Sequence, residues 1–359
     1  MTRKKLQQEF TQPLLSWFDL YGRKDLPWQI PRTPYRVWIS EIMLQQTQVQ
    51  TVIPYFNRFM QRFPDVNSLA MASEDEVLSL WSGLGYYSRA RNIHRTAKLI
   101  KEQQKSIFPA GKDLLLDLPG IGPSTAAAIL SQAFNLPAAI MDGNVKRVLT
   151  RFFLIKGWPE EAQVKKTLWE LADFCMPQER CADYTQAIMD LGATCCKPRN
   201  PNCGQCPVQD QCQAFKLQEQ HLYPTKKIKK PVPIHAQQFL TLYNEQGLIY
   251  LEKRPPTGLW GGLWCLPGIK SGECPMDFIE HHYALKGDKP ESIISFKHCF
   301  SHFHLEIDAV SIKVYSMANE MKESAGRWFT QEQLSSLGLA KPTTVILNEL
   351  YNSVLINKC

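Results

Sequence analysis

The feature that most constrains this chain is a short segment rich in cysteine. Four cysteines fall within 17 residues, separated by six, two and five residues: Cys196, Cys203, Cys206 and Cys212. Thiolates this close in sequence can wrap one compact centre, and most of the other cysteines are scattered. The N-terminus has basic residues but lacks the apolar stretch of a secretory signal, which disfavours a disulfide framework. The spacing therefore predicts a metal centre in residues 196–212.

Two kinds of centre are compatible with this spacing. Structural zinc sites usually pair two close-spaced cysteine knuckles across an intervening segment. Here a single Cys-x-x-Cys has two longer arms, which better matches a [4Fe–4S] cubane. The spacing favours the cluster over zinc, and buried thiols without metal are the least favoured alternative. Cys195 could replace Cys196 only by stretching the first spacing to seven residues.

The chain of 359 residues is long enough for two domains, and its character changes near residue 220. Residues 1–215 are mostly periodic in the manner of helices. The stretch from Pro224 to Pro233 is charged and broken by proline, which predicts a linker. Alternating apolar and polar residues beyond it predict strands. The expected helices are 35–60, 113–118, 124–132, 144–153, 162–174, 183–191, 274–283 and 343–355, and the expected strands are 239–243, 248–252, 295–299, 303–310 and 312–315.

The charge of the chain is moderately basic. The formal net charge is +7, and four lysines fall in residues 221–230. This excess permits a polyanionic partner such as nucleic acid, but a need for solubility explains it equally well. No apolar run approaches the roughly 18 residues of a membrane-spanning helix, so no membrane contact is expected. A cytosolic location follows as the default.

Two glycines in the segment LPGIGPSTA join two expected helices. Gly120 and Gly122 permit backbone geometry closed to other residues, and the next helix begins near Ser124. Exposed amides at a helix N-terminus can bind a phosphate oxygen, although an ordinary helix–turn–helix with a glycine cap explains the pattern too. Asp142 lies in a second glycine-containing turn before a helix, where it is either an N-cap residue or a functional carboxylate.

LPGIGPSTA, MDGNV and the four cysteines together resemble the helix-hairpin-helix DNA glycosylase superfamily with its iron–sulfur loop. The resemblance implies a DNA-binding hairpin at Gly120 and Gly122, and it places Asp142 beside a nucleoside flipped out of the duplex. In the endonuclease III-like lyases of this superfamily, a lysine at the position of Ser124 attacks the sugar. The serine at position 124 therefore favours base hydrolysis without strand cleavage. Lys146 is expected near the DNA, where its amine would form covalent adducts with the sugar only weakly.

A second stretch narrows the family. Glu41, Gln45 and Gln48 in WISEIMLQQTQ share one helical stripe, which by itself is most simply a solvated helix face. However, this stretch closely resembles the adenine DNA glycosylases of the MutY family, as do LPW, GLGYYSRARN and MDGNVKRVL. The resemblance covers most of residues 10–215 and implies that Glu41 is the active-site glutamate.

The chemistry of such an enzyme suits two carboxyl groups with opposite protonation. Breaking the N-glycosidic bond of adenine requires protonation of the departing base and stabilisation of a sugar cation. We predict that Glu41 donates the proton and that Asp142 stabilises the cation. Asn144 and Ser124 are expected to orient these groups.

An extruded base leaves a gap in the duplex that the enzyme must fill. The resemblance implies that Gln46 and Tyr86 fill it, although Tyr86 without the family match could equally be a core aromatic. The basic residues Arg89, Arg91, Arg95 and Lys98 are expected to form one helical face against phosphates or solvent.

GLWGGLWCLPG, residues 258–268, resembles the start of Nudix (MutT-like) domains. A working Nudix hydrolase needs a helix with a carboxylate cluster for magnesium, and residues 269–290 lack the paired carboxylates. We therefore predict the fold without the hydrolase. The resemblance also implies that Phe300, Ser301 and His302 recognise 8-oxoguanine opposite the adenine, whereas alone the nearby histidines would indicate a polar strand face.

The predicted fold class is multidomain α and α/β. An all-α helix-hairpin-helix glycosylase domain covers residues 1–220 with the cluster loop 196–212, a linker covers 221–236, and an α/β Nudix-like domain covers 237–359. The predicted function is a monofunctional DNA glycosylase that removes adenine paired with 8-oxoguanine or guanine. The alternatives are a bifunctional endonuclease III-like lyase and a non-catalytic iron–sulfur DNA-binding protein. We expect a monomer with one [4Fe–4S] cluster and no catalytic metal, acting on double-stranded DNA in the cytoplasm at the nucleoid.

Overall fold

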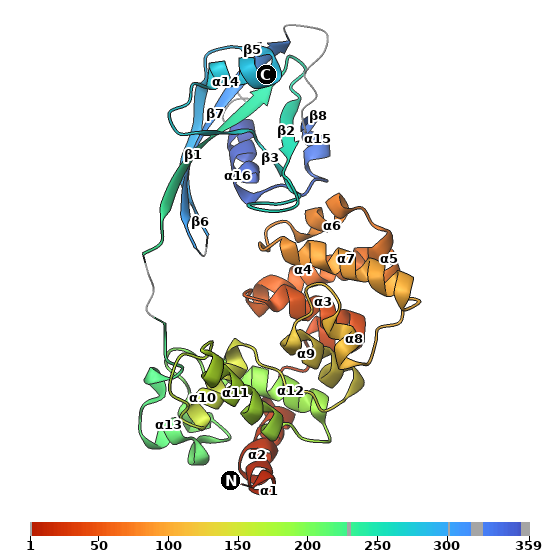
Figure 1. The fold of residues 1–359 in the computed structure, drawn as a ribbon, viewed down its shortest axis with the longest axis vertical. Coiled ribbons are helices and arrows are strands. Elements are labelled where there is room, and N and C mark those ends of the chain that lie inside the picture. The colour runs from red at the N-terminus through yellow and green to blue at the C-terminus, as the bar shows by residue number, and fades with distance from the viewer. Residues whose placement is uncertain (1, 228–230, 301, 317–325, 353–359) are drawn as a thin grey trace. The chain divides into compact units, whose positions relative to one another are not determined.

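The computed structural model describes residues 2–227, 231–300, 302–316 and 326–352. The chain divides into two compact units, and Figure 1 labels the helices and strands of both. The first comprises Met1–Met71 and Asn92–Lys229, and the second comprises Ala72–Arg91 and Lys230–Cys359. The second unit thus includes a short stretch from inside the predicted glycosylase domain, and the boundary falls within one helix, α7 (Ser88–Gln103).

Helices, turns and loops make up the described part of the first unit (Figure 1). The predicted helices between residues 113 and 191 are confirmed to within two residues at each end. The helices of this unit other than α7 are α1 (Arg3–Leu6), α2 (Gln12–Tyr21), α3 (Pro34–Leu44), α4 (Val49–Arg62), α5 (Val66–Met71), α8 (Lys112–Leu116), α9 (Pro123–Phe134), α10 (Gly143–Phe152), α11 (Ala162–Cys175), α12 (Cys181–Asp190) and α13 (Gln213–Lys216).

The prediction of one helical segment over residues 35–60 is wrong, because the chain forms α3 and α4 with a loop between them at residues 45–48. Gln46 has a φ of 58°, in the left-handed region that does not continue a right-handed helix. The stripe of Glu41, Gln45 and Gln48 therefore does not lie on one helix.

The helices that carry the predicted site residues form one packed group. α9 packs against α3, α8 and α12, and α10 packs against α11, α12 and α13. Two alanines of α9, Ala126 and Ala128, are fully buried, and their small side chains let neighbouring helices approach closely. Residues from the first half of the chain are thus fixed beside residues from positions 120–190.

The described residues of the second unit form a mixed eight-stranded sheet. Five strands follow the order β3-β2-β1-β7-β5; in addition, β4 pairs with β1, β6 pairs with β7 and β8 pairs with β2. β1 and β7 run parallel in a register from Ile234↔His304 to Tyr243↔Lys313, and the other strand pairs are antiparallel. The strands are β1 (Ile234–Tyr243), β2 (Ile249–Lys253), β3 (Trp264–Cys265), β4 (Gly268–Lys270), β5 (Leu285–Gly287), β6 (Glu291–Cys299), β7 (His304–Ser316) and β8 (Gly326–Phe329), and the helices are α6 (Glu74–Trp81), α14 (Pro275–Tyr283), α15 (Gln331–Leu334) and α16 (Lys341–Leu350).

Apolar residues alternate between the two faces of this sheet, as expected for strands covered on both sides. On one face, Phe239 and Ile307 pack with residues of α15 and α16, including Ile346. On the other, Leu240 and Ile312 pack with residues of α14. The predicted fold class, a helical domain followed by an α/β domain, is confirmed.

Several features of this unit differ from the expectations. β3, β4, β5 and β8 were not predicted because two to four residues are too few to show an alternating pattern. β1 already begins at Ile234, inside the predicted linker of 221–236, because its first residues pair with β7. Among the described residues of the whole chain, no helix has the length and apolarity needed to cross a lipid bilayer.

Candidate active site and cysteine loop

A cavity of about 730 Å³ in the first unit gathers most of the predicted catalytic residues. Glu41 near the end of α3 and Asp142 at the start of α10 both line it, although 101 positions separate them in the sequence. Ser124, Asn144 and Gln46 line the same cavity. The packing of α3 against α9, and of α10 against α12, brings these segments together.

Glu41 lies in an environment that disfavours its charged form. Its Oε1 accepts a hydrogen bond of 3.1 Å from Nε2 of Gln132 on α9. Burial of the carboxyl raises the pKa of Glu41 to about 7; the nearby charge of Asp142 adds to this rise and the Gln132 hydrogen bond opposes it. Glu41 is therefore able to hold a proton near neutral pH.

Asp142 is the N-cap residue of α10, in agreement with the simpler reading of its sequence context. Its Oδ1 accepts from the N–H of Val145 at 2.7 Å, and its Oδ2 accepts from Nδ2 of Asn144 at 3.0 Å. Burial raises the pKa of Asp142, while these two hydrogen bonds and the charge of Arg147 oppose the rise. The positive end of the helix dipole also favours a negative charge at this position.

Ser124 and Asn144 support the backbone around Asp142. The hydroxyl of Ser124 accepts a hydrogen bond of 3.0 Å from the N–H of Met141, the residue before Asp142. Oδ1 of Asn144 accepts from Nη2 of Arg147 at 2.8 Å. The predicted orienting residues thus contact Asp142 or its neighbour.

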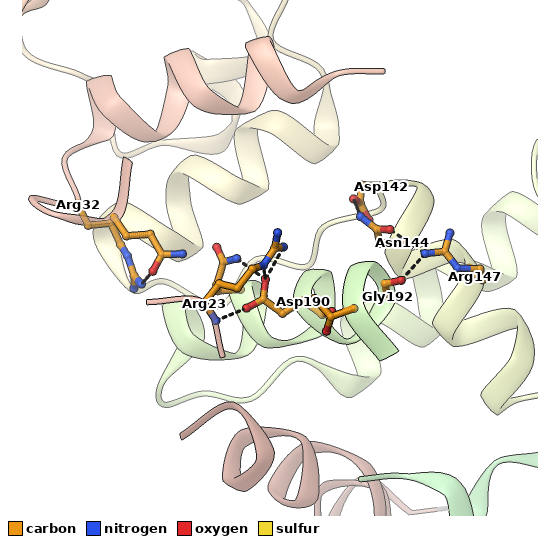
Figure 2. Close-up of polar contacts among 10 residues, drawn as sticks. Arg23, Arg32, Asp142, Asn144, Arg147, Asp190 and Gly192 are labelled. Atoms are coloured by element: carbon orange, nitrogen blue, oxygen red, sulfur yellow. Dashed lines mark hydrogen bonds and ion pairs between the residues drawn. The ribbon is translucent and has the colours of Figure 1, made fainter. Parts of the chain in front are cut away.

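Arg147, which the sequence analysis did not single out, connects this site to the cysteine loop. Figure 2 shows its guanidinium between Asn144 and the carbonyl oxygen of Gly192, to which Nη2 donates at 2.6 Å. Its Nε donates to the carbonyl oxygen of Cys196 at 2.7 Å. A chain of hydrogen bonds therefore runs from Asp142 through Asn144 and Arg147 to the first cysteine of the loop.

The glycine turn has the predicted form. Gly120 has a φ of 81°, and a Cβ at this position would lie 2.8 Å from Cβ of Asn92, so only glycine fits. Gly122 is the N-cap residue of α9, and a Cβ there would meet open space. Lys146, expected near DNA, lies on α10 and forms an ion pair with Glu160.

The four predicted ligands lie near one another. The thiol of Cys212 interacts electrostatically with those of Cys196, Cys203 and Cys206. Nη1 of the buried Arg151 donates to Sγ of Cys196 at 3.3 Å, and N–H groups directed at sulfur stabilise thiolates.

Four cysteine thiols form the donor set of this loop, and none of them is in a disulfide. Among the described residues, no three His, Cys, Asp or Glu side chains form a group that could hold one metal ion. Cys195 is also buried in this region, where its thiol donates to the carbonyl oxygen of Asn202 at 3.1 Å.

In the second unit, a cavity of about 380 Å³ is lined by Tyr86, Phe300 and His302. Tyr86 has a φ of 49° and is 47% exposed, so it is not a core aromatic. The N–H of Phe300 donates to the carbonyl oxygen of Phe303 at 2.9 Å, between the end of β6 and the start of β7. Ser301, between Phe300 and His302, lies outside the described residues.

One part of the predicted basic face is wrong. Arg89 is buried, and its Nη2 donates to the carbonyl oxygens of Leu84 and Gly85 while its guanidinium lies over the ring of Trp81. These contacts direct Arg89 inward. Nη1 of Arg91 donates to the carbonyl oxygen of Gly261, and of the four predicted residues Arg95 and Lys98 are exposed.

Two further charged residues were missed, Arg23 and the fully buried Asp190 on α12, both near the catalytic cavity. A signal for Asp190 was available in the sequence. It follows a run of apolar residues on the helix, and a charge in such a run requires a partner when buried.

Three segments of the chain match known families. Residues 39–173 match the HhH-GPD superfamily of base excision DNA repair proteins, and residues 238–349 match the NUDIX domain. Residues 196–212 match the iron–sulfur binding domain of endonuclease III, whose match begins at Cys196 rather than Cys195.

Curated relatives cover nearly the whole chain. An adenine DNA glycosylase of Buchnera aphidicola (subspecies Schizaphis graminum) is 40% identical over 339 residues, which is 94% of this chain and 97% of that protein. The human adenine DNA glycosylase is 33% identical over 400 residues, covering 92% of this chain and 72% of its own length. The chain belongs to the adenine DNA glycosylase (MutY) family. It is a DNA N-glycosylase, and the predictions of family and enzyme class are confirmed.

Solved structures agree on the fold. A thermostable thymine-DNA glycosylase matches with a TM-score of 0.55 and 28% identity, covering 60% of this chain and 98% of that one. A non-covalent endonuclease III–DNA complex matches with a TM-score of 0.51 and 21% identity, covering 61% of this chain and 98% of that one. Both support the helical glycosylase fold of the N-terminal part.

Proposed function

We propose that this glycosylase hydrolyses the N-glycosidic bond of adenine paired with 8-oxoguanine or guanine in duplex DNA, and that it has no lyase activity. One observation carries the proposal. The carboxyl groups of Glu41 and Asp142 line one cavity; burial raises the pKa of both, and at Asp142 hydrogen bonds from Val145 and Asn144 oppose the rise.

Glu41 is the proposed acid. Its pKa of about 7 leaves a substantial fraction of the side chain protonated at neutral pH. Transfer of this proton to N7 of an extruded adenine makes the base a better leaving group, and the electron pair of the C1′–N9 bond then departs with the base. Bound DNA would exclude water from the cavity and favour the neutral carboxyl further.

Asp142 is the proposed stabiliser of the sugar cation. The two hydrogen bonds that its carboxyl oxygens accept from Val145 and Asn144 stabilise the ionised form. A carboxylate held at this position lowers the energy of the positive charge that develops at C1′. Water then adds to C1′, and its proton can return to the carboxylate of Glu41.

The residues of the cavity favour simple hydrolysis over strand cleavage. Ser124 replaces the lysine of the lyases, and its hydroxyl is engaged with the Met141 N–H. Among the residues that the structure describes, the lining of the cavity includes Arg23 but no lysine. Lys146 lies nearby in sequence, but Glu160 pairs with its ammonium group.

Several other residues are proposed to hold the damaged duplex. Gly120 and Gly122 would present backbone amides to a phosphate at the start of α9. Gln46 and Tyr86, both with positive φ, would fill the gap left by the extruded adenine. The 8-oxoguanine would contact Phe300, Ser301 and His302. The protein would act on duplex DNA at the nucleoid, as a single copy of the chain.

The cysteine loop is proposed to carry one [4Fe–4S] cluster, held by Cys196, Cys203, Cys206 and Cys212. When bound, such a cluster would cross-link the four thiolates and so close the loop over residues 196–212. Arg147 and Arg151, which contact this loop, would then hold the start of α10 in place. No metal is proposed for the catalytic cavity.

A gel assay on a defined duplex tests the proposed function. The substrate is labelled DNA with one adenine opposite 8-oxoguanine, treated with the protein and then with or without hot alkali. We expect strand breaks only after alkali, because base removal alone leaves the backbone intact. Breaks without alkali would show a lyase, and no breaks in either lane would refute the glycosylase assignment for this base pair.

A further inference from the structure

Gln132 is a polar side chain within a run of buried small and apolar residues on α9. It lies in the last turn of this helix and is 4% exposed. A buried amide costs free energy unless its polar atoms find partners. The NH₂ group of Gln132 has such a partner in the carboxyl of Glu41, because Nε2 donates to Oε1 at 3.1 Å. This hydrogen bond links α9 to the proposed acid on α3.

The amide contacts the carboxyl from outside the catalytic cavity. The described lining of the cavity includes Glu41 but not Gln132. A base in the cavity would therefore meet the carboxyl and not the amide. In the hydrogen bonds described, Gln132 is the sole donor to Glu41, and it contacts only Oε1. The second carboxyl oxygen, Oε2, is thus left for a substrate.

The protonated and ionised forms of the carboxyl use this contact differently. A protonated carboxyl has one O–H donor and a carbonyl oxygen that accepts. An N–H directed at Oε1 suits the carbonyl oxygen, so it favours the proton on Oε2. After the proton has left, the same N–H donates to a charged carboxylate, and such hydrogen bonds are roughly twice as strong as neutral ones. The contact therefore strengthens as the proton is transferred, which lowers the barrier to the transfer.

We propose that Gln132 is a positioning residue for the acid: its amide holds Oε1 of Glu41, so that the transferable proton lies on Oε2, toward the extruded base. The inference rests on the proposed function and deepens it. In the transfer, the Oε2–H bond breaks as an N7–H bond forms on adenine, and the electron pair of the broken bond stays on the carboxylate. Gln132 stabilises that charge through Oε1 without touching the base.

Few charged groups surround Glu41. Asp142 raises its pKa from the start of α10. Neither α9 nor the short helix before α3 contains a charged side chain, although both pack against α3. The other charged residues that line the cavity or lie on α4, which also packs against α3, are Arg23, Arg58 and Arg62. A substitution at position 132 by a neutral residue alters none of these charges, so a shift in the pH dependence would report on the amide.

Gln132→Met tests the proposal, because methionine keeps the unbranched side chain and removes the donor. The measurement is the single-turnover rate of adenine release across the pH range in which Glu41 loses its proton. The Gln132 hydrogen bond lowers the pKa of Glu41, so its loss should move the alkaline fall of the rate up by about one pH unit. The rate below that fall should decrease about tenfold, because the proton is no longer held on Oε2.

The direction of the shift separates positioning from a structural effect. Burial is the main cause of the raised pKa of Glu41, so a loosened and wetter cavity would move the fall of the rate to lower pH. Loss of folded protein would lower the rate equally at every pH. Gln132→Leu removes the donor with a different shape and should agree with Gln132→Met. Gln163→Met is the matched control, because Gln163 on α11 is exposed, and it should keep the wild-type profile.

Three results would overturn the inference: a shift to lower pH, no shift, or a shift to higher pH with an unchanged rate below the fall. If neither variant folds, infrared difference spectra of the wild type against Glu41→Gln decide. The C=O stretch of protonated Glu41 should lie at the lower frequency of a hydrogen-bonded carbonyl, and a band at the frequency of a free carbonyl would refute the contact. A wild-type protein that releases no adenine would instead overturn the proposed function, and this inference with it.

Discussion

The two carboxyl groups of the catalytic cavity come from opposite ends of their helices. Glu41 lies near the C-terminal end of α3, where only Gln132 donates to it in the hydrogen bonds described. Asp142 precedes the first turn of α10, where a backbone N–H and the Asn144 amide both donate to it. Burial raises the pKa of each group. At Glu41 the Gln132 hydrogen bond opposes the rise, whereas at Asp142 hydrogen bonds from Val145 and Asn144 and the charge of Arg147 oppose it.

This difference shows how one cavity can support two protonation states. A carboxyl near the end of a helix faces the negative end of the dipole, whereas a carboxyl at a helix start faces the positive end. The backbone position of each carboxyl determines which end of a helix dipole it faces. Substitutions at the two sites should therefore have different and separable effects. The following predictions are ordered from the largest effect to the smallest.

Glu41→Gln should reduce the single-turnover rate of adenine release about a thousandfold or more, because the amide cannot supply a proton. Binding of the mispaired duplex, measured by fluorescence anisotropy, should stay near the wild-type value. Glu170→Gln on α11 is a matched control, since Glu170 is exposed and pairs with Lys166. Normal adenine release by Glu41→Gln would show that another group is the acid.

Asp142→Asn should reduce the same rate about a hundredfold or more, because a neutral amide cannot stabilise a cation at C1′. Asparagine caps helices as well as aspartate does, so the thermal midpoint should change little. The rate and the midpoint, measured on the same preparation, separate a catalytic from a structural effect. Loss of rate in proportion to loss of folded protein would contradict the proposed role.

The pH dependence of the rate should report the Glu41 proton. With a pKa of about 7, the protonated fraction falls tenfold for each pH unit well above 7. We expect the single-turnover rate of the wild type to fall accordingly between pH 8 and 9. A rate that is flat or rising across this range would argue against Glu41 as the acid.

Glu41→Gln should also stabilise the fold at alkaline pH. The pKa of Glu41 is about 7 in the folded chain and near 4.5 when exposed, so the folded state loses stability as pH rises from about 4.5 to 7. The variant avoids this loss and should gain about 3 kcal/mol in free energy of unfolding at pH 8. Urea unfolding at pH 8 and pH 5 tests this, because the gain should shrink at the lower pH. An equal gain at both would indicate a packing effect.

Local patterns predicted much of the fold. Helix caps, tight turns and strand faces depend on residues that are close together in the chain. The examples here are Asp142 before Gly143, the glycine turn at Gly120 and the alternation in β1. The short strands were not predictable in this way. β3, for example, has two residues and forms through pairing with β2.

The loop between α3 and α4 marks the limit of periodicity. Apolar spacing over residues 35–60 is compatible with one helix, but Gln46 takes a left-handed conformation and turns the chain. Gln45 and Gln48 nevertheless line the cavity with Glu41. The spacing by itself indicated a solvated helix face, whereas the loop between α3 and α4 brings Gln45 and Gln48 to the cavity.

By itself the sequence determined the family, the division into helical and α/β parts, the cysteine loop and the two acidic side chains, because each depends on residues close together in the chain. The tertiary structure alone decided that Glu41 and Asp142 share a cavity, and that Gln132 meets Glu41 across 91 positions. Such hydrogen bonds depend on how helices pack, and packing sums many weak contacts that no local spacing encodes.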